Sequence, residues 1–271
     1  MVTPERSGVE FTMKRAVEGE VMNDKTPPAR FTQGPNGRIA FLSREGRGPG
    51  LLWLGGYASD MRGTKAEAVD QWAAEKGVAY TRFDYSGHGE SDGDFEDGTI
   101  SAWTADAAHV LAEADGPQIL IGSSMGGWVA GLLLRQSPEK IAGMVLINPA
   151  PDFATELTPK QWPEEMWDTL QREGRLEIPS EFDDFVMVYT KAMFDDGEKQ
   201  RVLDKPLKAD CPIRMLSGME DDVVPFPHVI RYADHIEGED ITVTLIKSGD
   251  HRLSTEADIA RLLDTIGELV G

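Results

Sequence analysis

One serine stands in a pattern that could make it a nucleophile. Ser124 is the centre of the run Gly-Ser-Ser-Met-Gly at residues 122–126, which follows a branched apolar run at 119–121 and precedes an apolar stretch from Trp128. A serine that projects from a sharp strand-to-helix turn has strained backbone, so the residues two positions before and after it must lack side chains. Glycines occupy both positions.

A serine hydroxyl needs an adjacent base, which is in turn oriented by an acid. On a sheet built this way the acid and then the histidine follow the serine in sequence, each just after a strand. Asp221 follows a strand predicted over residues 213–217, and His251 follows one predicted over 241–246. The order therefore predicts a nucleophile, acid and base at Ser124, Asp221 and His251.

Neighbouring carboxylates leave alternatives for the acid. Glu220 and Asp222 flank Asp221 and could instead be solvated or bind backbone amides, with the spacing after Gly218 favouring Asp221. Asp250, beside the histidine, is better suited to accept hydrogen bonds within its loop.

The other histidines have simpler explanations. His88 lies in a glycine-rich loop at residues 84–93, where a structural hydrogen bond is expected. The other three histidines lie in predicted helices or at the start of one. A place in the core or on the surface explains each of them without a catalytic role: His109, His228 and His235.

Acyl transfer also needs two hydrogen-bond donors for the developing oxyanion. The backbone amide of Met125, directly after the serine, is one candidate. The second is expected from the loop Gly55-Gly56-Tyr57, with the amide of Tyr57 preferred, although these glycines could also be simple turn residues.

Apolar runs and helical periodicities alternate along the chain and predict an α/β fold with a doubly wound, mostly parallel sheet. Strands are expected at residues 39–42, 50–54, 78–83, 119–121, 141–147, 213–217 and 241–246. Helices are expected at 64–76, from 100 to 111, after 128, at 229–235 and from about 256.

The alternation stops between residues 153 and 209, which we interpret as an inserted helical cap. Two helical faces are expected there, one with Trp162, Met166 and Leu170 and one with Phe182, Phe185, Val186, Tyr189 and Met193. Packing within the cap explains these faces as well as substrate contact does. Residues 31–152 and 210–271 form the predicted core, and 1–30 a poorly ordered arm with a short edge strand near 9–13.

Composition excludes several function classes. A net charge of −20 argues against binding to nucleic acid or an anionic membrane, because like charges repel. The single cysteine, Cys211, precludes an internal disulfide, fits a reducing compartment and is expected to be buried and inert. No apolar run is long enough to span a membrane, and the first residues lack the apolar core of a signal peptide. We therefore expect a cytoplasmic protein.

Long sequence blocks resemble one family. RFDYSGHGESDG at 82–93, GPQILIGSSMGGW at 116–128, CPIRMLSGMEDDVVP at 211–225, SGDHRLSTEADI at 248–259 and the loop GGYASDMRGTK at 55–65 are similar to the α/β-hydrolase superfamily, and more narrowly to the subfamily of abhydrolase-domain protein ten with its bacterial relatives. The resemblance spans about residue 38 to the end.

The resemblance implies a serine esterase or thioesterase that acts on acylated substrates, since that family removes long acyl chains from cysteine thioesters and cleaves acyl glucuronides. It implies no metal and no cofactor. A short-chain carboxylesterase or lactonase is an alternative, and so is a non-catalytic protein that binds small molecules on the same fold.

Overall fold

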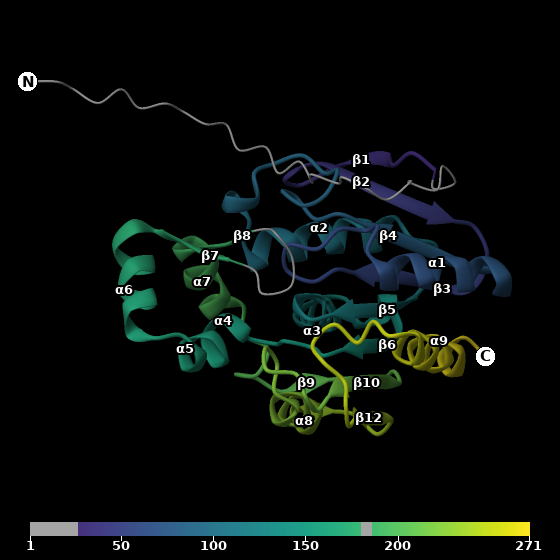
Figure 1. The fold of residues 1–271 in the computed structure, drawn as a ribbon. Helices are drawn as coiled ribbons and strands as arrows, with labels where there is room; N and C mark the ends of the chain where they lie inside the picture. The colour runs from purple at the N-terminus through teal and green to yellow at the C-terminus, as the bar shows by residue number, and fades with distance from the viewer. Residues whose placement is uncertain (1–26, 180–185) are drawn as a thin grey trace, which may run out of the picture.

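An eight-stranded sheet organises the part of the chain that the computed structural model describes, residues 27–179 and 186–271. Its order is β1-β2-β4-β3-β5-β6-β10-β12 (Figure 1). The strands are β1 Arg30–Gly34, β2 Gly37–Arg44, β3 Arg47–Leu54, β4 Val78–Phe83, β5 Gln118–Ser123, β6 Ile141–Ile147, β10 Ile213–Gly218 and β12 Ile241–Ile246.

Six neighbouring strands of this sheet run parallel to one another, as the sequence predicts: β4, β3, β5, β6, β10 and β12. Almost every residue of β5 and β6 is buried, because helices cover both faces of such a sheet and its strands become continuous apolar runs. This confirms the predicted α/β-hydrolase class of fold.

The first two strands depart from the predicted pattern. β2 pairs antiparallel with β4, and β1 folds back antiparallel on β2. No strand is predicted at β1, because its residues RFTQG contain one apolar side chain, Phe31, which is 46% exposed. The edge strand predicted near residues 9–13 lies outside the described residues.

Two apolar clusters cover the two faces of the sheet. One includes Val69 of α1 and Ile266 of α9, and the other includes Trp103 of α2, Trp128 of α3 and Tyr232 of α8. The helices are α1 Thr64–Lys76, α2 Ile100–Glu113, α3 Met125–Gln136, α8 Phe226–His235 and α9 Glu256–Val270, with 3-10 turns η1 Phe95–Asp97 and η2 Pro138–Lys140.

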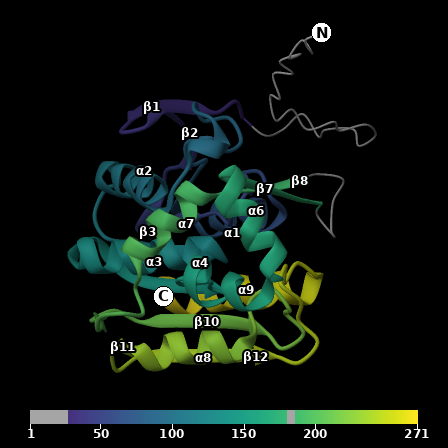
Figure 2. The same cartoon turned by 90° about the vertical axis from the view of Figure 1, so that its left-hand side faces the viewer.

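The insertion forms a cap at one end of the sheet, as Figures 1 and 2 show. Its helices are short, and a hairpin of two antiparallel strands lies among them. The elements are α4 Phe153–Glu156, α5 Thr158–Gln161, α6 Glu164–Glu173, β7 Arg175–Pro179, β8 Val186–Thr190, α7 Lys191–Gly197 and η3 Glu198–Gln200.

The second helical face predicted in the cap is therefore wrong at residues 186–190. Residues 186–190 read VMVYT and form β8, because branched and aromatic side chains favour extended structure. Phe182 and Phe185, assigned to the same helical face, lie outside the described residues. Trp162 follows α5 and does not belong to α6, whose Leu170 is fully buried.

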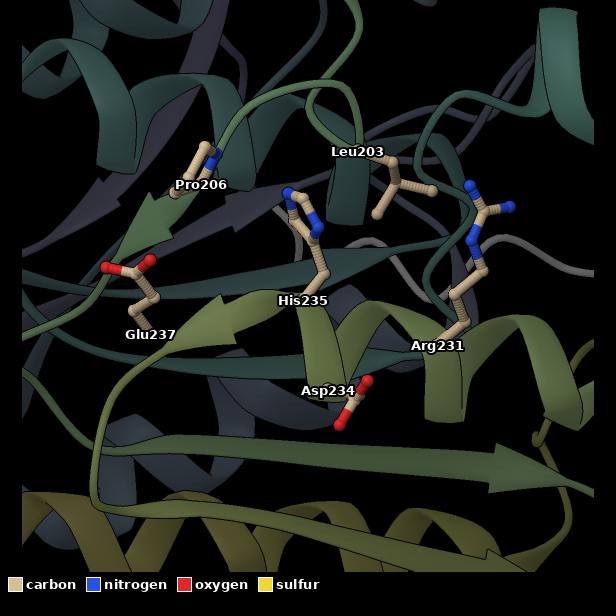
Figure 3. A pocket seen from close by; sticks show the side chains of 6 residues that line it. All are labelled: Leu203, Pro206, Arg231, Asp234, His235 and Glu237. Carbon is tan, nitrogen blue, oxygen red and sulfur yellow. The ribbon is translucent and has the colours of Figure 1, made fainter.

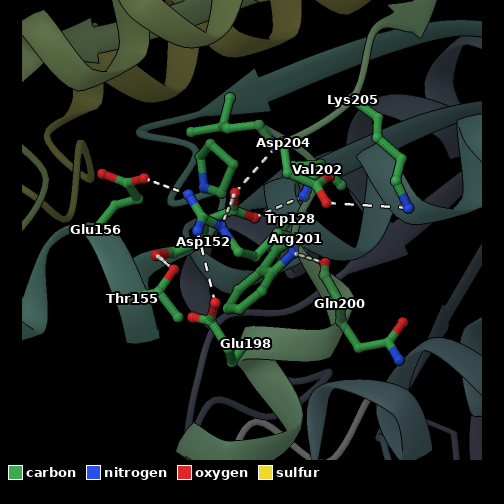
Figure 4. Close-up of polar contacts among 12 residues, drawn as sticks. Trp128, Asp152, Thr155, Glu156, Glu198, Gln200, Arg201, Val202, Asp204 and Lys205 are labelled. Atoms are coloured by element: carbon green, nitrogen blue, oxygen red, sulfur yellow. Dashed lines mark hydrogen bonds and ion pairs between the residues drawn. The ribbon is translucent and has the colours of Figure 1, made fainter.

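A buried carboxylate fastens the two ends of the cap together. Asp152, just before α4, is fully buried and accepts hydrogen bonds from the backbone amides of Val202 (2.8 Å) and Leu203 (2.9 Å). Arg201 lies beside it and pairs with Glu156 at 2.6 Å and with Glu198 at 3.6 Å (Figure 4). Burial raises the pKa of Asp152 although both amides favour its charged form.

The chain then returns to the core through β9 Leu207–Lys208, which pairs with β11 Ile236–Glu237. The segment that leads into the cap therefore contacts the segment that leaves it through the carboxylate of Asp152.

We predict that Asp152→Asn lowers the free energy of unfolding by about 1–3 kcal/mol, because the new amide group faces at least one buried N–H that then lacks an acceptor. Asparagine tolerates the left-handed backbone found here (φ 54°), so the change isolates the hydrogen bonds. Urea unfolding provides the measurement. Glu198→Gln is the matched control, since this exposed ion-pair partner should contribute less than about 1 kcal/mol. Equal effects in the two variants would contradict the account.

Candidate active site

Ser124 occupies a strained turn between β5 and α3. Its backbone has φ 53° and ψ −115°, a conformation that non-glycine residues rarely adopt. Three backbone hydrogen bonds hold it: its amide donates to Ile147 at 2.9 Å, and its carbonyl accepts from Gly127 at 2.9 Å and from Ala150 at 3.0 Å. The side chain of Ser124 keeps partial exposure.

The two flanking glycines are required by close packing. A Cβ atom on Gly126 would lie 2.0 Å from the carbonyl oxygen of Leu54 in β3, and one on Gly122 would lie 2.6 Å from the carbonyl oxygen of Gly126. No side chain fits at either distance, so the pattern of residues 122–126 is fixed by the approach of three backbone segments.

Asp221 and His251 are in direct contact. The His251 Nδ1 lies 2.8 Å from the Asp221 Oδ2. The Asp221 side chain is inaccessible to solvent, and its other oxygen accepts from the backbone amides of Val223 (2.9 Å) and Val224 (2.8 Å). Glu220 and Asp222, the alternatives in the same loop, are exposed. The geometry thus selects Asp221 as the carboxylate that orients the histidine.

Sheet topology places these residues at one edge. β5, β6, β10 and β12 are parallel neighbours in that order, and Ser124, Asp221 and His251 each follow the carboxyl end of one of them. Sites in open α/β sheets form at this edge. Asp250 accepts the amide of Leu253 at 2.8 Å, which is the loop role expected for it.

The loop after β3 lies against the serine. A Cβ atom on Gly56 would be 3.5 Å from the Cβ of Ser124, which shows how closely the backbone of Gly55-Gly56-Tyr57 approaches the candidate nucleophile. Met125, the first residue of α3, is fully buried. Of the two residues whose amides are predicted to bind the oxyanion, Met125 follows Ser124 in sequence, and Tyr57 follows the glycine whose backbone approaches Ser124.

Tyr57 also joins this loop to the cap. Its ring stacks on Tyr189 of β8, with centroids 5.2 Å apart and planes 9° apart, and its hydroxyl donates to the carbonyl of Val188. Phe153 of α4 packs edge-on against it at 6.1 Å. Burial raises the pKa of the Tyr57 phenol well above its ordinary value, so the hydroxyl stays protonated and donates.

The remaining cap aromatics pack mainly on one another. Trp162 lies near the centre of this group, with its ring 4.9 Å from Tyr189, 5.2 Å from Trp167 and 5.4 Å from Phe194. Of the two roles expected for apolar cap residues, packing and substrate contact, the structure shows packing for this group.

His88 is buried inside an aromatic group near this loop. Its Nδ1 lies 3.3 Å from the Ser86 carbonyl oxygen, and its ring contacts Tyr85, Phe95 and Trp103 edge-on. Within the described residues its Nε2 has no hydrogen-bond partner. Burial lowers the pKa of His88 to about 4, so the ring is neutral at pH 7.

The three histidines on α2 and α8 contact groups other than Ser124. His228 is buried with its Nε2 2.8 Å from the Pro151 carbonyl oxygen, His235 contacts the Lys205 carbonyl at 2.7 Å, and His109 is half-exposed on α2. Cys211 is a free thiol that is half-buried, not fully buried as expected, and burial raises its pKa, which disfavours the reactive thiolate.

Sequence reasoning missed two polar residues around the histidine loop. Asn148, directly after β6, hydrogen-bonds both the acid and the histidine loops. Lys65 of α1 donates to the Arg252 carbonyl and lies 3.3 Å from the Ser254 hydroxyl, and burial lowers the pKa of Lys65 to about 8. The sequence does contain one signal for Asn148. It is a polar residue directly after a strand, and that strand lies between the strand that leads to Ser124 and the strand that leads to Asp221.

A surface depression of about 460 Å³ lies apart from these residues, between α8 and the segment that leads into β9 (Figure 3). Its lining includes none of the residues Ser124, Asp221 and His251. One of its charged residues, Arg231, forms an ion pair with Glu156 at 3.0 Å. Its lining residues are Leu203, Pro206, Arg231, Asp234, His235 and Glu237.

Among the described helices none is long and apolar enough to cross a membrane.

Known proteins resemble this chain in sequence and in fold. The family model described as "Serine aminopeptidase, S33" matches residues 53–179. Human "Palmitoyl-protein thioesterase ABHD10, mitochondrial" is 37% identical over 235 residues, which cover 86% of this chain and 76% of the human protein. The bovine protein of the same name is 36% identical over the same length.

The chain belongs to the ABHD10 family of α/β hydrolases. Solved structures agree: mouse ABHD10 superposes with a TM-score of 0.82 at 34% identity, covering 90% of this chain and 98% of the mouse chain. The protein described as "Putative hydrolase from Agrobacterium vitis S4" superposes with a TM-score of 0.86 at 38% identity, covering 91% of this chain and 100% of that one. This membership makes the chain a hydrolase.

We predict that His88 makes the protein sensitive to acid. An unfolded histidine binds a proton near pH 6.5, whereas His88 in the fold binds one only near 4, so stability present above pH 6.5 is lost as the pH falls through this window. Between pH 7 and 4.5 the loss from this residue should be about 2–3 kcal/mol. His88→Phe should therefore show a shallower acid decline than the unchanged protein in urea unfolding. Parallel declines in the two proteins would refute the prediction.

Proposed function

We propose that this hydrolase is a serine hydrolase that cleaves acyl esters or thioesters through an acyl-enzyme. The observation that carries the proposal is the 2.8 Å contact between His251 and the buried Asp221, at the sheet edge where Ser124 occupies its strained turn. A nucleophile, a base and an orienting carboxylate are the three groups this chemistry needs.

In the proposed first half-reaction Ser124 Oγ attacks the acyl carbonyl carbon while His251 Nε2 takes the hydroxyl proton. Asp221 accepts the Nδ1–H and thereby holds the ring with Nε2 facing the serine. His251 then delivers the proton to the leaving oxygen or sulfur, and the acyl group stays on Ser124. Water, deprotonated by His251, attacks the acyl-enzyme, and the proton returns to Ser124 as the acid leaves.

The backbone amides of Met125 and Tyr57 are proposed to bind the oxyanion. Support comes from the position of Met125 at the first turn of α3, where amides are free to donate, and from the close approach of the Gly56 backbone to Ser124. Loss of one such donor costs on the order of a hundredfold in rate or more.

For the substrate we propose an acyl thioester with a long chain. The relatives named palmitoyl-protein thioesterase support the thioester. Tyr57 and Tyr189 stack on each other but are only partly buried, so the accessible part of their rings offers apolar surface for an alkyl chain beside the loop that approaches Ser124. Acyl glucuronides remain a second proposed substrate class.

The cytoplasm remains our proposed location. It rests on the single cysteine, while the mammalian relatives carry the word mitochondrial in their names. Recovery of the native protein in a membrane or organelle fraction of its own cells would contradict it.

We predict that Ser124→Ala abolishes turnover and leaves the fold intact, because it removes only the hydroxyl. With this variant as the blank, kcat/KM is measured for matched acyl thioesters and oxygen esters from two to sixteen carbons. The proposal expects kcat/KM to rise with chain length on the thioesters, since each buried methylene contributes about 0.8 kcal/mol at most.

Two results would change the account. Unchanged activity in Ser124→Ala would end the serine mechanism. A preference for short oxygen esters would keep the mechanism and reassign the protein as a small-substrate carboxylesterase or lactonase.

A further inference from the structure

Asn148 is a buried amide at the centre of the candidate site that the mechanism above does not use. It is the first residue after β6, between the strand that carries Ser124 and the strand that leads to Asp221. Its exposure is zero, and its backbone is left-handed, with φ 40°. Asparagine is among the few residues that tolerate this conformation.

The Asn148 side chain bonds to the loop that carries His251 and to the end of β10, which leads into the loop that carries Asp221. Its Nδ2 donates to the backbone carbonyls of Asp250 (3.0 Å) and His251 (2.9 Å). Its Oδ1 accepts the backbone amide of Gly218 at 2.8 Å, three residues before Asp221. The backbone amide of Asn148 also donates to the Leu216 carbonyl at 2.8 Å.

The two loops meet backbone to backbone at the same place. The amide of Glu220 donates to the carbonyl of Gly249 at 2.9 Å, and a Cβ atom on Gly218 would lie 2.3 Å from that same oxygen. There is no room for another side chain between the loops. Asn148 reaches them from β6 and ties the histidine loop to the strand next to the nucleophile.

We propose that Asn148 is a positioning residue for the Asp221–His251 pair. The inference rests on the proposed function, since it assigns a role within that catalytic machinery. His251 is held at two points, at Nδ1 by Asp221 and at its own carbonyl by Asn148. The second point fixes the main chain from which the imidazole extends, and so the place of Nε2 relative to Ser124.

The physical consequence is a strong dependence of rate on this one amide. Without it, the partly buried carbonyls of Asp250 and His251 and the buried amide of Gly218 lose a partner, and the loop can recover partners only by moving. A shift of about 1 Å in a catalytic group can cost on the order of a hundredfold in rate. Substrate binding under the cap should change little, because Asn148 is buried behind the two loops.

The test compares Asn148→Asp and Asn148→Ala with a matched control. Asn148→Asp keeps the shape, the tolerance of left-handed backbone and the acceptor for Gly218, but a carboxylate cannot donate to the two carbonyls. The control is Leu111→Ala, a core truncation near the end of α2 that should lower the melting temperature without touching the site.

With a short activated ester as substrate, both Asn148 variants should lose about ten- to a hundredfold in kcat, with KM within about twofold of the unchanged protein. Leu111→Ala should keep its kcat at temperatures where it is folded. A wild-type kcat in folded Asn148→Asp, or an equal kcat loss in Leu111→Ala, would overturn the inference.

Ser124→Ala separates this inference from the proposed function. If Ser124→Ala is inactive and Asn148→Asp turns over at the wild-type rate, only the role of Asn148 falls. If Ser124→Ala retains activity, the serine mechanism falls and the positioning role falls with it.

Discussion

The strained backbone of Ser124 is the constraint on which the rest of the site depends. A residue with φ 53° and ψ −115° costs on the order of 1–3 kcal/mol and persists only where its surroundings enforce it. Here β3, β5 and α3 approach so closely that a Cβ atom on Gly126 would collide with the Leu54 carbonyl at 2.0 Å. The buried parallel strands on both sides supply the rigidity that keeps the serine exposed at the sheet edge.

Few contacts hold the other groups of the candidate site in place at this edge of the sheet. Asp221 is oriented by two backbone amides, His251 by Asp221 and Asn148, and the loop at Tyr57 by the cap hairpin through Tyr189 and Val188. Asp152 fastens both ends of the cap beside the core. The cap therefore connects to the loop whose amide is proposed to bind the oxyanion, so that a substrate under the cap and the reacting centre share one structural support.

The central strands and the order of Ser124, Asp221 and His251 could be predicted because both leave local signals, continuous apolar runs and polar loops just after them. β1 could not, since its residues gain a partner only from β2 at the edge of the sheet. The sequence predicts a helix at β8 because its apolar residues also fit a helical period, but pairing with β7 makes this segment a strand. The role of Asn148 depends on partners 70, 102 and 103 residues away in sequence, which no local pattern reveals.

Ser124 is proposed to be a nucleophile that His251 activates. A fluorophosphonate tests this directly when it reacts with the folded protein, unchanged and as His251→Ala, and the digested adduct is identified by mass spectrometry. The account predicts one adduct on Ser124, formed at least about a hundredfold more slowly without the histidine, as expected of a general base. An adduct on another residue, or none on Ser124 in the folded protein, would contradict it.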